Sequence, residues 1–211
     1  MSQPSKAGRV WGLTLRDRVL IALVGALIVA AKFYIHIPMR VPGHTGIFWM
    51  ALLIIGAGVI GRPGAGTLIG VVSGVLAAIF LPQSQGPLAG VKYFAPGLVV
   101  DLLTPLLGGR LDRLIPATVV GAAANMSKLG ASYLLGLAMG VPGGYLAIGL
   151  GYAATTHLVF GALGGLAGAL VLGRLARAGV PGPPETAAAP PASEESAACG
   201  AGSSMPLSVS R

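Results

Sequence analysis

The sequence contains little charge for its length. Only 9% of the 211 residues are Asp, Glu, Lys or Arg, while 54% are hydrophobic and the mean hydropathy is +0.81. A soluble domain carries charge on about a quarter of its residues, so this composition excludes an ordinary soluble protein. Several apolar stretches approach the roughly 20 residues that cross the hydrocarbon core of a bilayer. The chain is therefore expected to be an integral membrane protein.

The sequence also lacks the short motifs of several enzyme classes. It has no Gly-Lys dipeptide and hence no P-loop, no His-Glu-x-x-His and no Gly-x-Ser-x-Gly. Asp101 is the one acid within the apolar segments, which excludes an intramembrane protease with two catalytic aspartates. The single cysteine, Cys199, cannot form an internal disulfide, and no metal-ligand cluster surrounds it. We expect no enzymatic activity, no metal and no cofactor.

Breaks rich in proline and glycine divide the apolar region into segments. The pattern predicts an all-α integral membrane protein with six transmembrane helices, at about residues 18–35, 46–60, 65–81, 88–107, 115–139 and 144–172. Pro96 is expected to interrupt the fourth segment, and the long sixth segment to be kinked or to extend beyond the membrane. Residues 1–17 would be a cytoplasmic lead, 18–177 the membrane domain, and 178–211 a disordered cytoplasmic tail, because the composition of that tail cannot bury a core.

The basic residues predict an orientation. One set of alternate loops and segment ends carries seven arginines: Arg16, Arg18, Arg62, Arg110, Arg113, Arg174 and Arg177. The other set carries Arg40, with Lys32 near the end of the first segment. Since basic residues stay in the cytoplasm, both termini are expected there, in a multi-pass protein of a bacterial-type plasma membrane in contact with the lipid bilayer. The net charge of +8 is scattered between apolar segments, so no nucleic-acid partner is expected.

The candidate site residues within the predicted membrane helices are Lys92, Asp101, Asn125, Lys128 and His157. Charged groups in a membrane are costly and are usually functional or paired. In one interpretation Asp101 and Lys128 form a neutralising pair that only holds two helices together. In the other, several of these groups line a ligand cavity, where the lysines favour an anionic group and Asp101 an aminopyrimidine.

Aromatic residues near the expected outer surface are a second group of candidates. Trp49 and Tyr93 lie beside an unusual loop and a charged position, and His44 lies within that loop. Such residues often serve only as interfacial anchors. Alternatively, Trp49 and Tyr93 stack a flat heterocyclic ligand while His44 belongs to a lid.

Small residues follow one line of the first predicted helix. Ala22, Ala26 and Ala30 are spaced by four and therefore lie on one face. A line of small side chains permits close approach of another helix, either inside this protein or from an external partner.

The sequence resembles the substrate-binding S components of energy-coupling factor (ECF) vitamin transporters over about residues 16–177. The likeness is carried by six short spans, the Ala22-x-x-x-Ala26-x-x-x-Ala30 line and the proline-glycine loop that follows it. It is most similar to the hydroxymethylpyrimidine/thiamine type, on the segments Gly46-Ile47-Phe48-Trp49, Arg62-Pro63-Gly64-Ala65 and Gly86-Pro87-Leu88, together with Asp101.

This resemblance implies a protein that captures one small vitamin-like molecule from the outer side. It implies association with a transmembrane coupling subunit, through the span-one alanines, and with two cytosolic ATPases. It further implies a pocket lined by spans four to six. Two rival functions stay open at this stage: a self-sufficient small-solute permease and a non-transporting membrane scaffold.

Overall fold

The protein is helical throughout the residues that its computed structural model describes, which are 13–34, 44–80 and 90–179. The helices are α1 (Leu15–Tyr34), α2 (Gly46–Ile60), α3 (Ala65–Phe80), α4 (Val91–Leu106), α5 (Leu114–Ala138), α6 (Gly143–Ala147) and α7 (Leu150–Arg177). The prediction of an all-α fold is confirmed. The lid loop before His44, the segment Gly86-Pro87-Leu88 and most of the predicted terminal segments lie outside the described residues.

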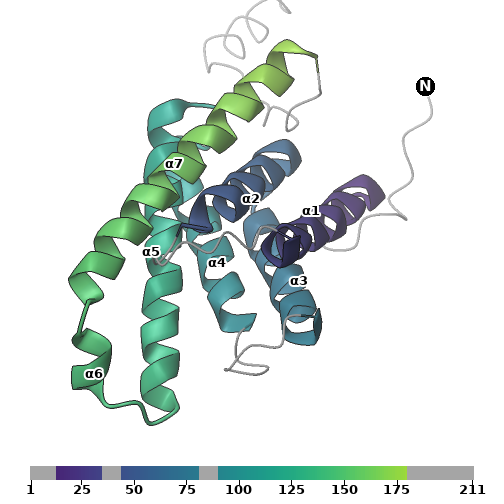
Figure 1. Ribbon diagram of the computed structural model, residues 1–211. Coiled ribbons are helices and arrows are strands. Elements are labelled where there is room, and N and C mark those ends of the chain that lie inside the picture. Colours follow the sequence, from purple (N-terminus) through teal and green to yellow (C-terminus); the bar gives the residue numbers. More distant parts are fainter. Residues whose placement is uncertain (1–12, 35–43, 81–89, 180–211) are drawn as a thin grey trace, which may run out of the picture.

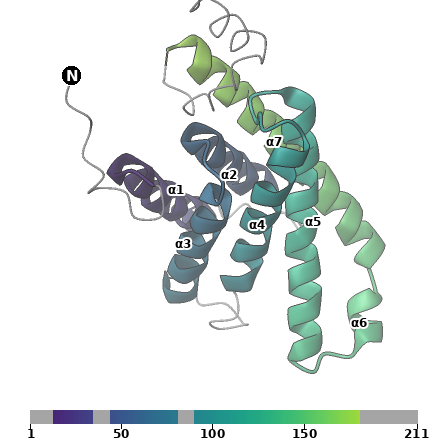
Figure 2. The same ribbon diagram turned by 180° about the vertical axis from the view of Figure 1, so that it is seen from behind.

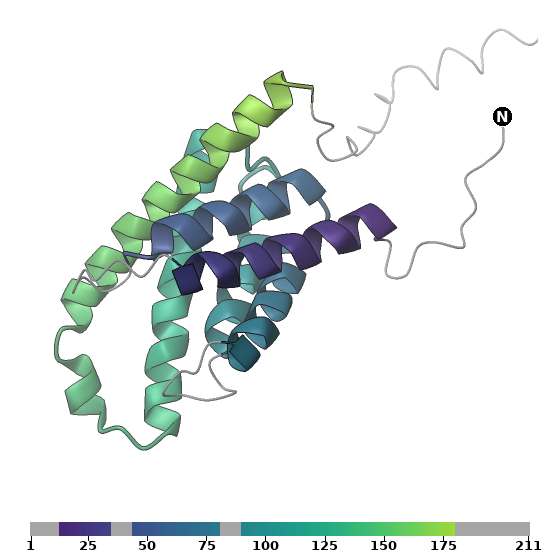
Figure 3. The same ribbon diagram turned by 45° about the vertical axis from the view of Figure 1, so that its right-hand side comes forward.

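The six longer helices form two layers. Helices α1, α2 and α7 lie side by side in one layer (Figures 1 and 3), and α3, α4 and α5 form the other (Figure 2). Helix α1 packs on α3, and α7 packs along α5, so the outer members of the layers meet. Helix α2 lies between α1 and α7 and contacts α3 as well. Helix α2 is therefore the middle helix of its layer, and one of its sides packs on the other layer.

Local sequence explains where these helices end. Helix α2 stops at Gly61, which adopts a left-handed conformation with φ of 60° and donates its N–H to the Ala57 carbonyl. Gly64 (φ 88°) completes the turn before α3. Glycine adopts positive φ without a steric penalty, so the predicted tight turn at residues 61–64 is confirmed.

The sixth predicted segment is broken near its start, in agreement with the kink expected from its length. The chain forms the short helix α6, breaks at Ile148 and Gly149, and then continues as α7. Gly149 has a φ of 79°, which ends one helix and reorients the chain before the next. The predicted interruption at Pro96 is wrong, because α4 continues through Pro96 and Pro105.

Glycines bring the longer helices into close contact. A Cβ on Gly121 of α5 would lie 2.5 Å from the Gly161 carbonyl oxygen and 2.8 Å from the Gly165 Cα of α7. Gly97 of α4 meets the Gly66 carbonyl of α3 in the same way. These glycines therefore serve packing between the helices of this bundle, as small residues do between membrane helices.

The outward faces of several helices are apolar. On α1, Leu15, Val19, Leu23 and Leu27 are exposed at a spacing of four; α3 exposes Val71, Val75 and Ile79, and α4 exposes Val91, Phe94, Leu98 and Leu102. In a soluble bundle these faces would be polar. By length and composition alone, α7 is the one described helix that could cross a membrane, while α2 and α3 are strongly apolar but shorter.

Candidate ligand-binding site

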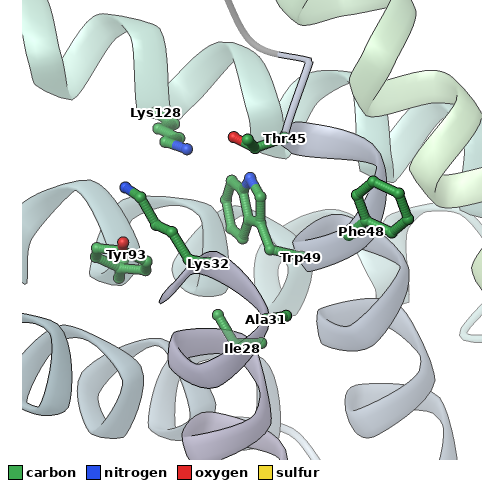
Figure 4. Close-up of a pocket in the computed structure, with 8 residues that line it drawn as sticks. All are labelled: Ile28, Ala31, Lys32, Thr45, Phe48, Trp49, Tyr93 and Lys128. Carbon is green, nitrogen blue, oxygen red and sulfur yellow. The ribbon is translucent and has the colours of Figure 1, made fainter. Parts of the chain in front are cut away.

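A cavity lies between the two layers, at the end where α1 finishes and α2 begins (Figure 4). It contains about 340 Å³ of empty space, including its open mouth. Little of this space is wide enough for a water molecule, so a ligand would have to displace the side chains that enter it. The lining residues are Ile28, Ala31, Lys32, Thr45, Phe48, Trp49, Tyr93 and Lys128.

Trp49 and Tyr93 form the aromatic wall of this cavity. Their ring centroids are 6.3 Å apart in an edge-to-face arrangement, with 62° between the planes. Both side chains are buried, with exposed fractions of 5% and 4%. Close helix packing holds them there: the Tyr93 carbonyl lies 2.6 Å from where a Cβ of Gly70 would be, and Gly164 admits the first turn of α2 against α7. The predicted pairing of Trp49 and Tyr93 in one site therefore has a geometric basis.

Two lysines point into the same cavity. The Lys128 ammonium lies 4.5 Å from the centroid of the Trp49 ring, and the Lys32 ammonium lies 5.3 Å from that of Tyr93. A cation over an aromatic face is attracted by the ring quadrupole. Figure 4 shows the two ammonium groups reaching the space beside the indole from different helices. The site thus combines two flat apolar surfaces with two cations.

Two buried polar atoms of the wall have no hydrogen-bond partner among the residues that the structure describes. They are the Trp49 Nε1 and the Tyr93 hydroxyl. Buried polar groups are almost always hydrogen-bonded, and an unsatisfied one costs about 1–3 kcal/mol. Unpaired donors on the wall of a cavity are what a site for a polar ligand requires.

Asn125 and His157 form a polar contact beside this cavity but do not line it. The Asn125 Nδ2 donates to the backbone carbonyl of His157 over 2.7 Å, which joins α5 to α7. The His157 Nδ1 lies 2.8 Å from the carbonyl of Ala153 on its own helix. Gly46 packs directly on the Asn125 amide, so this contact also supports the start of α2. His44 lies just before Thr45, outside the set of lining residues.

Asp101 is hydrogen-bonded to groups other than Lys128. The interpretation in which these two residues form a neutralising pair is therefore wrong. The Asp101 carboxylate accepts hydrogen bonds from the Gly66 N–H (3.0 Å), the Thr67 N–H (2.6 Å) and the Thr67 hydroxyl (2.5 Å). These donors belong to the first turn of α3, where backbone N–H groups have no acceptor within the helix. A carboxylate there also complements the helix dipole. Asp101 therefore anchors α3 to α4 and lies outside the cavity.

The cavity draws on a different set of helices from the one expected. Its residues come from α1, α2, α4 and α5, whereas α7 contributes none. Lys32 was noted in the sequence only as a loop charge, yet it lines the site. Lys92 does not line it, although its charge and that of Lys32 both act on Lys128. The signal for Lys32 was a lysine in the last turn of α1, directly after the uncharged run of residues 19–31.

Charges of the described residues separate between the two ends of the molecule. The three lysines, Lys32, Lys92 and Lys128, gather at and around the cavity. The opposite end carries Asp101, the Asp17–Arg62 ion pair (3.0 Å) and the Arg110–Asp112 pair (2.8 Å). At that end the hydrogen bonds from Arg110 hold the pKa of Asp112 below its ordinary value.

The alanine line of α1 faces outward in part. Ala22 and Ala26 are exposed, and Ala30 is half-buried. Packing inside this bundle therefore does not explain the first two positions. They remain available to a second protein.

One solved structure resembles this chain over most of its length. It is described as the crystal structure of an S-component of an ECF transporter, with a TM-score of 0.52, 19% sequence identity, and coverage of 80% of this chain and 88% of the other. The chain has the S-component fold. Neither a protein-family model nor a curated protein sequence matches it.

Proposed function

We propose that this chain is an integral membrane protein with six spans, formed by α1–α5 and α7. The apolar outward faces of α1, α3 and α4 support this, since a soluble monomer rarely exposes apolar patches of more than a few hundred Å². The arginine-rich end would lie in the cytoplasm with both termini, following the positive-inside rule. The cavity would then open toward the outer side of a bacterial-type plasma membrane.

Within that membrane, we infer that the chain is the substrate-binding subunit of an ECF-type importer. The cavity that combines Trp49, Tyr93 and two lysines, within an S-component fold, carries this proposal. Its ligand would be a small vitamin or vitamin precursor, and it would not act as an enzyme. Its partners would be a transmembrane coupling subunit and two cytosolic ATPases, because the sequence contains no P-loop of its own.

A thiamine-like or hydroxymethylpyrimidine-like ligand was expected from the sequence, in part on Asp101. That carboxylate is engaged with the first turn of α3. The cavity therefore offers no acid for an aminopyrimidine among the described residues. The wider assignment to a small vitamin-like ligand does not depend on Asp101.

The test is uptake by purified protein in proteoliposomes. Vesicles that contain this chain together with the coupling subunit and ATPases of its source organism should accumulate the ligand only when ATP is inside. Uptake by the chain alone would identify a self-sufficient permease. If the purified chain binds no small molecule, the result favours the non-transporting membrane scaffold.

A further inference from the structure

We propose that the ligand of this cavity is a small organic anion, whose carboxylate or phosphate group binds between the ammonium groups of Lys32 and Lys128. The proposal rests on the ligand-binding function inferred above and adds the chemical class of the ligand. It follows from the charges around the cavity and from the hydrogen-bonding character of its wall.

No acidic side chain in the described part of the chain pairs with the lysines of the cavity. The whole chain has six acidic residues. Asp17, Asp101 and Asp112 belong to the opposite end, and the three glutamates lie in residues 180–211, outside the described part. Lysine charges that are taken out of water need a counter-charge or a cavity that provides one. A bound anion supplies it to Lys32 and Lys128.

Three of the hydrogen-bonding side chains that line the cavity can only donate, while the hydroxyls of Thr45 and Tyr93 can donate or accept. The Trp49 Nε1 can only donate, and the lysine ammonium groups can only donate. The Tyr93 hydroxyl also has no partner among the residues placed by the structure, and both aromatic side chains are at least nine-tenths buried. A group with only acceptor atoms complements this set, and ionised carboxylates and phosphates are such groups. Hydrogen bonds to ionised acceptors are also stronger than those between neutral groups.

The lysine positions also indicate how the rest of the ligand binds. Lys128 covers the face of Trp49, and Lys32 covers that of Tyr93. An anion that draws the ammonium groups away from the rings leaves aromatic surface for a flat or apolar body. The space at the cavity, about 340 Å³ including its open mouth, admits only a small molecule, and only after the side chains that enter it move aside.

A cationic ligand is disfavoured by the same arrangement. A thiamine-type cation would be placed among ammonium groups without a carboxylate to accept it. Like charges at short range in a site of low polarity repel strongly. Asp101 of α4, the residue that would have attracted a cation, is hydrogen-bonded to the first turn of α3 and lies outside the cavity.

The test uses Trp49 as a reporter in the full-length chain. The protein has two tryptophans, so the Trp11→Phe variant leaves Trp49 as the single emitter. The purified variant is titrated with benzoate, with benzamide (its uncharged analogue of equal size), with phenyl phosphate, with inorganic phosphate and with thiamine. We expect saturable changes for the anions with aromatic bodies, and at least about tenfold weaker binding of benzamide.

The two oxyanion sources are separated by these probes. Tighter binding of phenyl phosphate than of benzoate assigns a phosphate monoester, and the reverse assigns a carboxylate. Inorganic phosphate measures how much the aromatic body adds. In either case Lys128→Gln and Lys32→Gln should each weaken binding about ten- to hundredfold. Arg177→Gln, which removes the same charge from an exposed site at the other end, should leave it unchanged.

The proposal is overturned if neither aromatic anion binds, if benzamide or thiamine binds as tightly as they do, or if Lys128→Gln leaves their affinity intact in a protein that still melts cooperatively. Binding of benzamide or thiamine alone would remove the anion assignment and retain the ligand-binding function. Failure of the transport function would be seen separately, as the absence of ATP-dependent uptake.

Discussion

Asp101 joins two helices through three hydrogen bonds at the end of the molecule opposite to the cavity. Each of its carboxylate oxygens accepts from the first turn of α3. Removal of one partner from such a contact leaves a donor unsatisfied, which costs more than the bond itself contributes. This residue is therefore expected to matter for stability and not for ligand affinity.

Asp101→Asn should lower the free energy of unfolding by about 1–3 kcal/mol, because the new amide group presents N–H donors to the Gly66 or Thr67 N–H. The melting temperature in detergent measures this effect, and titration of the Trp11→Phe protein with benzoate measures affinity, which should not change. Asp112→Asn removes an equal charge from an exposed ion pair and should have a much smaller effect on stability. If Asp101→Asn loses benzoate binding at an unchanged melting temperature, Asp101 contacts the ligand and this structural role is contradicted.

Sequence reasoning identified single residues where the local pattern is unusual. Trp49, Tyr93 and Lys128 stand out in apolar helices, and the structure brings them together. The partner of Asp101 and the inclusion of Lys32 depend on how each helix is rotated against others far away in the sequence. That rotation is set by packing, such as the close contact of Gly66 with α4, and no local pattern encodes it.

Helix α5 contacts α7 over most of its length, with backbones in direct contact at three glycines. Gly121, Gly161 and Gly165 have no room for a methyl group. This seam holds the helix that carries Lys128. At these glycines backbone packs against backbone, so no flexible side chain can move aside to accept an added methyl group.

Gly121→Ala should destabilise the protein by about 1–3 kcal/mol, because the methyl group forces α5 and α7 apart. Gly130→Ala is the matched control in the same helix, since a Cβ there meets nothing within 4 Å. It should stabilise by about 0.5–1 kcal/mol through helix propensity. Thermal unfolding of the two variants side by side decides the matter, and equal melting temperatures would contradict this role of the seam.

The exposed alanines of α1 form an element-scale surface of a different kind. Ala26→Trp should block close approach of a coupling-subunit helix, while ligand binding by the isolated chain persists. Co-purification with the coupling subunit measures complex formation. Ligand binding is measured by titration of the Trp11→Phe protein with benzoate, and there Ala26→Phe takes the place of Ala26→Trp so that Trp49 stays the single tryptophan. Leu27→Trp is the control, because Leu27 is exposed but already bulky. If both the Ala26→Trp and the Leu27→Trp variants form the complex, the alanine line of α1 faces lipid and not the coupling subunit.

Helix boundaries were predicted well where proline and glycine signals are local. Helix α2 runs over the predicted residues 46–60, and α3 begins at the predicted Ala65. A kink in the sixth segment was expected from its length, but its position between α6 and α7 was not, because Gly149 is one of several glycines in that region and only its positive φ distinguishes it. Pro96 led to the prediction of a break that does not exist, because proline is tolerated inside a membrane helix when neighbouring groups satisfy the freed carbonyl.

At the scale of the whole molecule, the described lysines lie at one end, and the described arginines and aspartates lie at the other. This separation predicts the orientation in the membrane. In a Cys199→Ser background, a cysteine at Met139, which is exposed beside the turn to α6, should react with an impermeant thiol reagent in intact cells. A cysteine at Arg110 in the turn between α4 and α5 should react only after lysis. The opposite pattern would invert the proposed topology.

The lengths of α3 and α4 have a consequence for the surrounding lipid. Each has 16 residues, or about 24 Å at 1.5 Å per residue, against a hydrocarbon core of about 30 Å. Acyl chains beside their apolar outer faces must therefore shorten, at a fraction of a kcal/mol for each ångström of mismatch. Two proteins with equally short helices share one such compressed annulus when they associate. The thickness of the bilayer then becomes part of the affinity between this chain and any partner, and longer acyl chains strengthen their association.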